Sequence, residues 1–145
     1  MRFRDFVAGA HFQSAHRDVG KDEIIAFARR YDPQPFHVDP AAAAASRWGG
    51  LIASGWLTCA VAMELAVTSV LTGSESIGSP GVDELRWQRP VRPGDRLRLS
   101  LTVLDSRVAS SGETGIVRWH WELHNQRDER VLELTAVSFF DLAAA

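Results

Sequence analysis

One long apolar segment, which begins at Gly55, constrains the fold more than any other feature of the sequence. It reads GWLTCAVAMELAVTSVLTG and contains one charged residue, Glu64, before it ends at Gly73. Apolar residues would occupy every side of a helix formed here, which is typical of a helix buried in a domain or in a membrane. Because a membrane span needs about 20 apolar residues and Glu64 interrupts this segment, we predict a central buried helix, N-capped by Ser54, and no association with a membrane.

After this segment the apolar period changes from that of a helix to that of a strand. Alternating apolar and polar side chains indicate strands with one buried face. Four strands are predicted, at residues 82–89, 95–104, 117–124 and 130–140, with a less regular one near residues 11–19. An antiparallel sheet curled around the buried helix satisfies this pattern, because its outer polar face can meet water. The predicted class is α+β, with one domain over residues 1–145 and a frayed end at the last three alanines.

The composition is that of an ordinary globular protein and removes several classes of function. A chain of 145 residues is long enough to bury one sizeable core without disulfides or metals. The net charge of −2 and the pI of about 6.2 do not favour nucleic acid as a partner. The one cysteine, Cys59, cannot form an intrachain disulfide, and no Cys/His spacing suggests a metal site. The first residues lack the apolar region of a secretory signal, so a cytoplasmic location is expected.

A predicted helix at residues 21–31 leads into the segment YDPQPFHVDP, which carries candidate chemistry. Three prolines restrict the backbone here, so Asp32 and His37 are held in defined positions. Their ordinary pKa values of roughly 3.9 and 6.5 allow the pair to accept one proton and donate another near neutral pH. The addition of water to a double bond and the elimination of water to form one both require these two proton transfers. The competing interpretation is that Asp32 turns the chain and His37 is an ordinary loop histidine.

The start of the buried helix is the second candidate element. The segment GGLIASGWL leads into the free N–H groups of the first turn, which form the positive end of the helix. Gly55 lacks a side chain, so a ligand oxygen could approach its backbone N–H and be stabilised there as it gains negative charge. Close packing of the helix start against the sheet would favour glycine equally, and both interpretations stay open. Asp39, followed by Pro40, is predicted to cap the alanine-rich helix after it.

These segments together resemble the MaoC-like dehydratase family, which includes the (R)-specific enoyl-CoA hydratases. The hallmark is an aspartate, a proline-bearing turn, a histidine five residues on, a further aspartate and a Gly-rich approach to a central helix. Here these are Asp32, PQPF, His37, Asp39 and GGLIASGWL, and LRWQRPVRPGDRL at residues 85–97 is similar to the family's strand–turn–strand. The sequence departs from the family at Gln34, where asparagine is frequent, and at Ser54, where histidine is frequent.

The resemblance implies the hotdog fold, a curled antiparallel sheet wrapped around one long helix. It also implies a homodimer or larger assembly, with an acyl-thioester channel near the subunit interface. It makes Asp32 and His37 the catalytic pair and the Gly55 N–H a holder of the thioester oxygen, with Ser54 and Trp56 as neighbouring substrate-binding candidates. The substrate would be a 2-enoyl or 3-hydroxyacyl thioester of CoA or of a carrier protein, and no cofactor or metal is expected.

Two other functions stay open on the same fold. Some hotdog hydrolases use a carboxylate on the central helix, where this chain has Glu64. A buried carboxylate needs a partner, so an arginine contact or exposure at an interface would explain Glu64 equally well. The third possibility is a protein that binds acyl thioesters without converting them, because a fold does not by itself establish a function.

Several other reactive residue types are assigned structural roles. His120 and His124 share a predicted outer strand face with Arg118 and Glu122, which indicates a solvated surface. Trp87, Trp119 and Trp121 are predicted to lie in the core or at a dimer interface. Cys59 is expected to be a small core residue of the buried helix.

Overall fold

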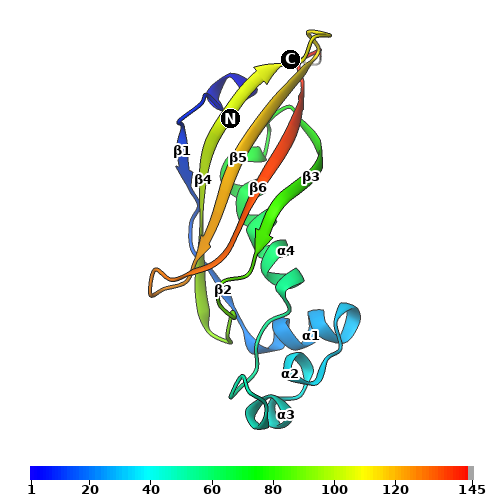
Figure 1. Cartoon of the computed structure of the whole chain (residues 1–145), viewed down its shortest axis with the longest axis vertical. Helices are drawn as coiled ribbons and strands as arrows, with labels where there is room; N and C mark the ends of the chain where they lie inside the picture. The colour runs from blue at the N-terminus through cyan, green and yellow to red at the C-terminus, as the bar shows by residue number, and fades with distance from the viewer. Residues whose placement is uncertain (144–145) are drawn as a thin grey trace.

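A curled antiparallel sheet wraps around one helix in the computed structural model, which describes residues 1–143 (Figure 1). The strand order is β1-β4-β5-β6-β3, and β2 also pairs with β4. The strands are β1 His11–Gln13, β2 Arg17–Val19, β3 Ser76–Arg86, β4 Asp95–Val108, β5 Thr114–His124 and β6 Arg130–Asp141. The predicted α+β hotdog fold is confirmed. Ala144 and Ala145, which belong to the predicted domain and frayed end, lie outside the described residues.

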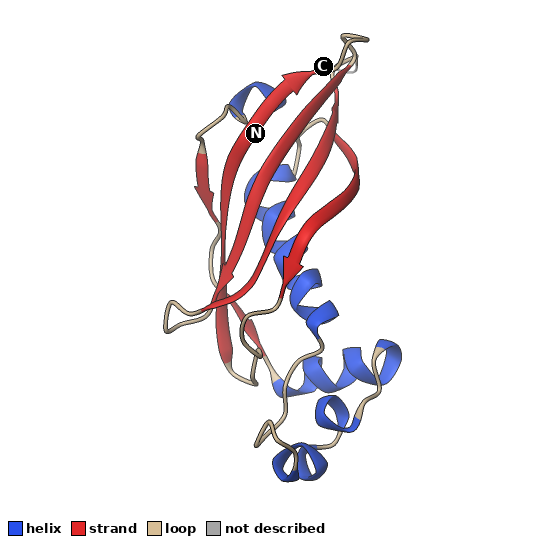
Figure 2. Cartoon of the chain, in the orientation of Figure 1, coloured by secondary structure: helices blue, strands red, loops and turns tan. Residues whose placement is uncertain are grey.

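The helices gather mainly at one end of the sheet, as Figure 2 shows. They are η1 Phe3–Asp5, α1 Lys21–Tyr31, α2 Pro35–Val38, α3 Pro40–Ala45 and α4 Gly55–Ala66, which η2 Val67–Leu71 continues. The short helices α1, α2 and α3 surround the end of the molecule where α4 begins, while α4 itself runs along one face of the sheet (Figure 1). Within residues 1–143, none of these helices has the length and apolar character that crossing a membrane requires.

The four predicted strands are present, but β3 differs from its predicted bounds. It begins at Ser76 and ends at Arg86, so Trp87 lies beyond it. Gly78, Pro80 and Gly81 interrupt the apolar alternation in its first half, and the pairing with β6 shifts register there. The sequence pattern therefore reveals only the second half of this edge strand.

The alternating side chains of β4 and β5 form most of the sheet's buried face. On β4 the inward residues are Leu97, Leu99, Leu101 and Val103, and on β5 they are Val117, Trp119, Trp121 and Leu123. Trp119 is fully buried, and its indole N–H donates to the Ser138 hydroxyl at 3.1 Å, so its polar atom is satisfied within the core. Trp119 and Trp121 are therefore core residues, as the sequence predicts.

Helix α4 is covered by the sheet along one side. Its buried residues are Leu57, Thr58, Val61, Ala62, Leu65 and Ala66. Trp56, Met63 and Val67 remain exposed on the other side. One chain supplies one sheet, which can cover only one side of a helix, so the all-round apolar character of α4 exceeds what this chain alone buries.

Two predicted caps fix the short helices and the start of α4. The Asp39 carboxylate accepts hydrogen bonds from the Ala41 and Ala42 N–H groups at 3.0 and 3.2 Å, which caps α3. The Ser54 hydroxyl accepts from the Trp56 N–H at 3.3 Å, which caps α4. Both confirm the prediction that side-chain oxygens satisfy the free N–H groups of a first turn.

We expect Leu99→Ala to lower the free energy of unfolding by about 2–5 kcal/mol, because it leaves a cavity in the buried face of β4. Leu104 lies on the same strand but is exposed, so Leu104→Ala is expected to change this free energy by about 0.5 kcal/mol or less. Urea unfolding followed by tryptophan fluorescence measures both values. Equal losses in the two variants would contradict the assignment of the buried face.

Candidate active site

Asp32 and His37 meet where α1 gives way to α2. Asp32 follows the last residue of α1, and its N–H donates to the Ala28 carbonyl oxygen at 2.8 Å, which closes that helix. His37 lies in α2, whose first residue is Pro35. Oδ2 of Asp32 is 3.2 Å from Nε2 of His37. The structure thus brings together the two residues that the sequence singles out, at a distance that allows proton exchange.

His37 is held by the backbone that leads into α4. Its ring is buried, and Nδ1 lies 2.7 Å from the carbonyl oxygen of Ile52. A carbonyl oxygen can only accept a hydrogen bond, so Nδ1 carries a hydrogen. The Ile52 N–H donates back to the Phe36 carbonyl oxygen at 3.2 Å, so two hydrogen bonds join α2 to this segment. Nε2 is therefore the nitrogen left to exchange a proton beside Asp32.

The surroundings of Asp32 favour its ionised form. Burial raises the pKa of Asp32, but hydrogen bonds from the Gln34 and Ser54 side chains and the charge of His37 outweigh it, so the pKa lies below its ordinary value. The Gln34 amide nitrogen donates to Oδ1 at 2.7 Å. Asp32 is therefore a carboxylate through the neutral pH range, and the stabilisation from these contacts is lost only as the pH falls through its lowered pKa.

Gly55 begins α4 and packs tightly against Trp87. A methyl group built on Gly55 would lie 2.5 Å from Cε2 of Trp87, and the Trp87 indole N–H donates to the Gly55 carbonyl oxygen at 2.9 Å. Close packing thus explains the glycine, although the packing partner is the side chain of Trp87 beyond β3 and not the sheet itself. Among residues 1–143, no acceptor takes the Gly55 N–H. This free donor at the positive end of α4 keeps the other interpretation available.

A cavity of about 340 Å³ connects these groups. Asp32, His37 and Gly55 line it together with Trp56 and Trp87. A second cavity, of about 400 Å³, lies between α4 and the inner face of the sheet and is lined mainly by apolar side chains. Trp56 borders both cavities. The two spaces therefore adjoin at the start of α4, in the size range of small-molecule sites.

The other predicted candidates fall into three places. Ser54 is buried, caps α4 and does not line the cavity, whereas Trp56 lines it. Glu64 lies further along α4, where it is exposed and pairs with Arg17 at 3.0 Å. An arginine contact thus explains Glu64, and this residue does not line the cavity that holds Asp32 and His37.

Of the two predicted positions for Trp87, the core is excluded, because Trp87 is exposed and lines the cavity, and a position at a dimer interface stays a prediction. It follows the end of β3, so strand alternation does not decide where its side chain points.

The sequence interpretation did not identify Trp48 or the Ile52 carbonyl. Trp48 borders the same cavity, and only a count of aromatic residues near the glycine segment could have indicated it. A backbone carbonyl leaves no signal in the sequence.

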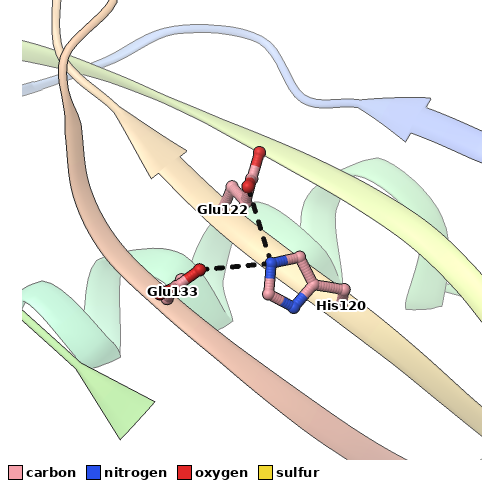
Figure 3. Close-up of side chains that lie close together, drawn as sticks. All are labelled: His120, Glu122 and Glu133. Atoms are coloured by element: carbon pink, nitrogen blue, oxygen red, sulfur yellow. Dashed lines mark ion pairs between the residues drawn. The ribbon is translucent and has the colours of Figure 1, made fainter. Parts of the chain in front are cut away.

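A separate cluster lies on the outer face of the sheet, where Figure 3 shows His120 between Glu122 and Glu133. Nε2 of His120 is 3.5 Å from one carboxylate oxygen of Glu122 and 3.5 Å from one of Glu133. The two glutamates are direct neighbours across β5 and β6, and Arg130 donates to Glu122 at 2.8 Å and pairs with Glu133 at 3.3 Å. These residue types can bind metals, but Arg130 balances the facing carboxylates and accounts for the cluster without an ion. The outer face is thus polar, as predicted, although these side chains are half-buried.

Comparison with known proteins gives consistent matches along most of the chain. The family model described as "MaoC like domain" matches residues 5–120. The uncharacterized protein YdeM of Bacillus subtilis is 32% identical over 133 residues, covering 92% of this chain and 94% of its own. The crystal structure of a MaoC-like dehydratase from Rhodospirillum rubrum is similar with a TM-score of 0.88 and 42% identity, covering 95% of this chain and 94% of that one. The R-hydratase PhaJ1 from Pseudomonas aeruginosa has a TM-score of 0.76 and 25% identity, covering 96% and 84%.

We expect neutral His37 to carry its hydrogen on Nδ1, because the Ile52 carbonyl oxygen can only accept. Nitrogen NMR of the protein with isotope-labelled histidine distinguishes the two tautomers. His11 serves as the comparison, because its Nδ1 lies 3.1 Å from the Thr102 hydroxyl, which can donate or accept. A neutral His37 with its hydrogen on Nε2 would show that the contact with Ile52 does not fix the ring.

Proposed function

The chain belongs to the MaoC-like domain family, and from this we propose that it hydrates 2-enoyl thioesters or dehydrates 3-hydroxyacyl thioesters. Asp32 and His37 are the proposed catalytic pair. The observation that carries the proposal is the 3.2 Å separation of their facing atoms, on a cavity that also contains the start of α4. A base, an acid and a free N–H donor are the groups that this reaction requires.

The geometry suggests how the pair would divide the proton transfers. Ionised Asp32 takes a proton from water as the water oxygen bonds to C3 of the enoyl group. Protonated His37 gives the hydrogen on Nε2 to C2, so the double bond becomes a single bond with OH on C3 and H on C2. The proton on Asp32 then passes to Nε2 of His37 and restores the starting state. General acid–base assistance of this kind typically accelerates a reaction by about 10²–10⁴-fold.

The start of α4 would stabilise the charge that develops during addition. As water attacks C3, electrons move toward the thioester carbonyl oxygen. The Gly55 N–H has no acceptor among residues 1–143 and lies at the positive end of a helix of 12 residues. A preorganised donor of this kind is typically worth about 10²–10³-fold in rate. Ser54 supports this arrangement indirectly by capping the same turn.

The second cavity supports an apolar acyl group as the bound part of the substrate. Successive turns of α4 line it with Trp56, Cys59 and Met63. The distance from Trp56 to Met63 along the helix axis is about 10 Å. Because Trp56 also borders the first cavity, a chain that begins beside Asp32 and His37 could continue along α4. CoA and a carrier protein are both proposed as the thiol component, and the proposed steps use no cofactor or metal.

We also propose a homodimer or larger homo-oligomer of one domain over the whole chain. Edge strand β3 pairs only with β6 among the described residues, and Ile77 and Val82 on it are exposed. Met63 on α4 and Val67 at the start of η2 are exposed as well. A second copy would cover this apolar surface, as expected for a permanent interface. A cytoplasmic location stays a prediction.

We expect Asp32→Asn and His37→Gln each to lower kcat/KM for enoyl-CoA hydration by at least about 100-fold, because each removes one proton transfer. Loss of the conjugated enoyl-thioester absorbance measures the rate. Glu64→Gln is the control, because Glu64 is exposed, pairs with Arg17 and does not line the cavity of Asp32 and His37. This variant should hydrate the substrate at the parent rate.

Three results would point elsewhere. Parent-like rates in the Asp32 and His37 variants would remove both from the mechanism. Release of free thiol that depends on Glu64 would favour a thioesterase. Tight binding of enoyl-CoA without any product would favour a protein that binds acyl thioesters and does not convert them.

A further inference from the structure

Gln34 occupies a position whose usual structural task it does not perform. It is the N-cap residue of α2, but its side chain makes no capping hydrogen bond. Asparagine, aspartate, serine and threonine are the residues that normally satisfy the free N–H groups at this position. A residue that breaks a local preference without a structural gain is a candidate for a functional role.

The side chain of Gln34 turns back to Asp32 instead. Its amide nitrogen donates to Oδ1 at 2.7 Å, and its backbone N–H donates to the Asp32 carbonyl oxygen at 2.8 Å. A carboxylate can only accept, so the NH₂ group of the amide must face it. Gln34 therefore holds both the main chain and the side chain of Asp32 across Pro33.

We infer that Gln34 is a positioning residue for the proposed catalytic pair, holding Oδ1 of Asp32 so that Oδ2 faces Nε2 of His37. This inference rests on the proposed function, and it concerns a residue that contacts neither of the reacting protons. The Ile52 carbonyl fixes the other half of the pair at 2.7 Å from Nδ1. Each member is thus held at the atom that does not exchange a proton, and the two exchanging atoms are left 3.2 Å apart.

Positioning of this kind matters because proton transfer depends steeply on geometry. A displacement of about 1 Å in a catalytic group can lower a rate by about 10²-fold. Asp32 lies after the end of α1, outside any helix, so helix geometry does not hold its side chain. A hydrogen bond to an ionised acceptor is shorter and stronger than one between neutral groups, and Gln34 supplies such a bond.

The same contact acts on the charge of Asp32. The groups that face the carboxylate are His37 from α2, Ser54 from the start of α4, and Gln34, while Arg89 is the other charged residue on the cavity. Burial raises the pKa of Asp32, and the hydrogen bond from Gln34 is foremost among the contacts that lower it. Removing the amide donor should therefore raise the pKa of Asp32 and shift the loss of its negative charge to higher pH.

The test compares Gln34→Met and Gln34→Glu with the parent. Methionine keeps the length of the side chain but removes the donor, and glutamate keeps its shape but replaces the donor with a negative charge. Gln13→Met is the matched control, because Gln13 lies on β1, contacts Ser100 on β4 and does not line the cavity. The measurements are the pH profile of kcat/KM for enoyl-CoA hydration, and carbon NMR titration of the protein with isotope-labelled aspartate.

We expect kcat/KM at neutral pH to fall about 10-fold in Gln34→Met, which corresponds to the loss of one hydrogen bond. The acidic limb of the profile should move to higher pH in the order parent, Gln34→Met, Gln34→Glu, with the Asp32 titration moving in parallel. Gln13→Met should match the parent in both measurements. At neutral pH the Gln34 variants should lose only the stability that the contact with Asp32 supplies, because the Gln34 side chain is exposed and makes no capping hydrogen bond.

A residue that merely fills space would give a different result. Parent-like profiles and an unchanged Asp32 titration in both Gln34 variants would overturn the inference. If the parent does not hydrate any enoyl thioester, the proposed function fails, but the NMR titration still reports whether Gln34 controls the charge of Asp32. An unchanged titration in an active enzyme overturns the role of Gln34 alone.

Discussion

The packing of α4 against the curled sheet is the constraint on which the rest of the structure depends. One side of this helix is buried against the inward residues of β4 and β5, and this side carries Leu57, Val61 and Leu65. This contact fixes where α4 begins, and the segment before it then determines where α2 can lie. The two hydrogen bonds between Ile52 and α2 make that connection directly. The core and the candidate site are thus positioned by the same helix.

The candidate site brings together three kinds of control over charge. Burial would favour neutral Asp32, but the Gln34 and Ser54 side chains and the charge of His37 favour the ionised form and outweigh burial. The Ile52 carbonyl decides which nitrogen of His37 faces Asp32. The first turn of α4 adds a positive end with a free N–H group. Asp32, His37 and the start of α4 therefore line one cavity, although three separate segments supply them.

Gly55 shows how one residue can satisfy packing and chemistry together. Its lack of a side chain lets the Trp87 indole approach and donate to the Gly55 carbonyl oxygen. Gly55 itself lines the cavity, and its N–H has no acceptor among residues 1–143. Packing alone is enough to require glycine here, so the requirement for glycine does not by itself demonstrate ligand binding. The proposed role rests on the free N–H and on its neighbours Asp32 and His37.

The sequence by itself determined the fold class, three of the four strands after Gly73 and half of β3, both helix caps and the pairing of Asp32 with His37. These follow from local periodicity, from proline and capping chemistry, and from a short motif, which are all properties of neighbouring residues. Only the tertiary structure showed the contacts of Ile52, Trp87 and Gln34 at the candidate site and placed Glu64 outside the cavity. A backbone carbonyl carries no residue identity, and a side chain beyond a strand end follows no alternation. Their contacts depend on how α2, α4 and β3 approach one another, which no local pattern in the sequence specifies.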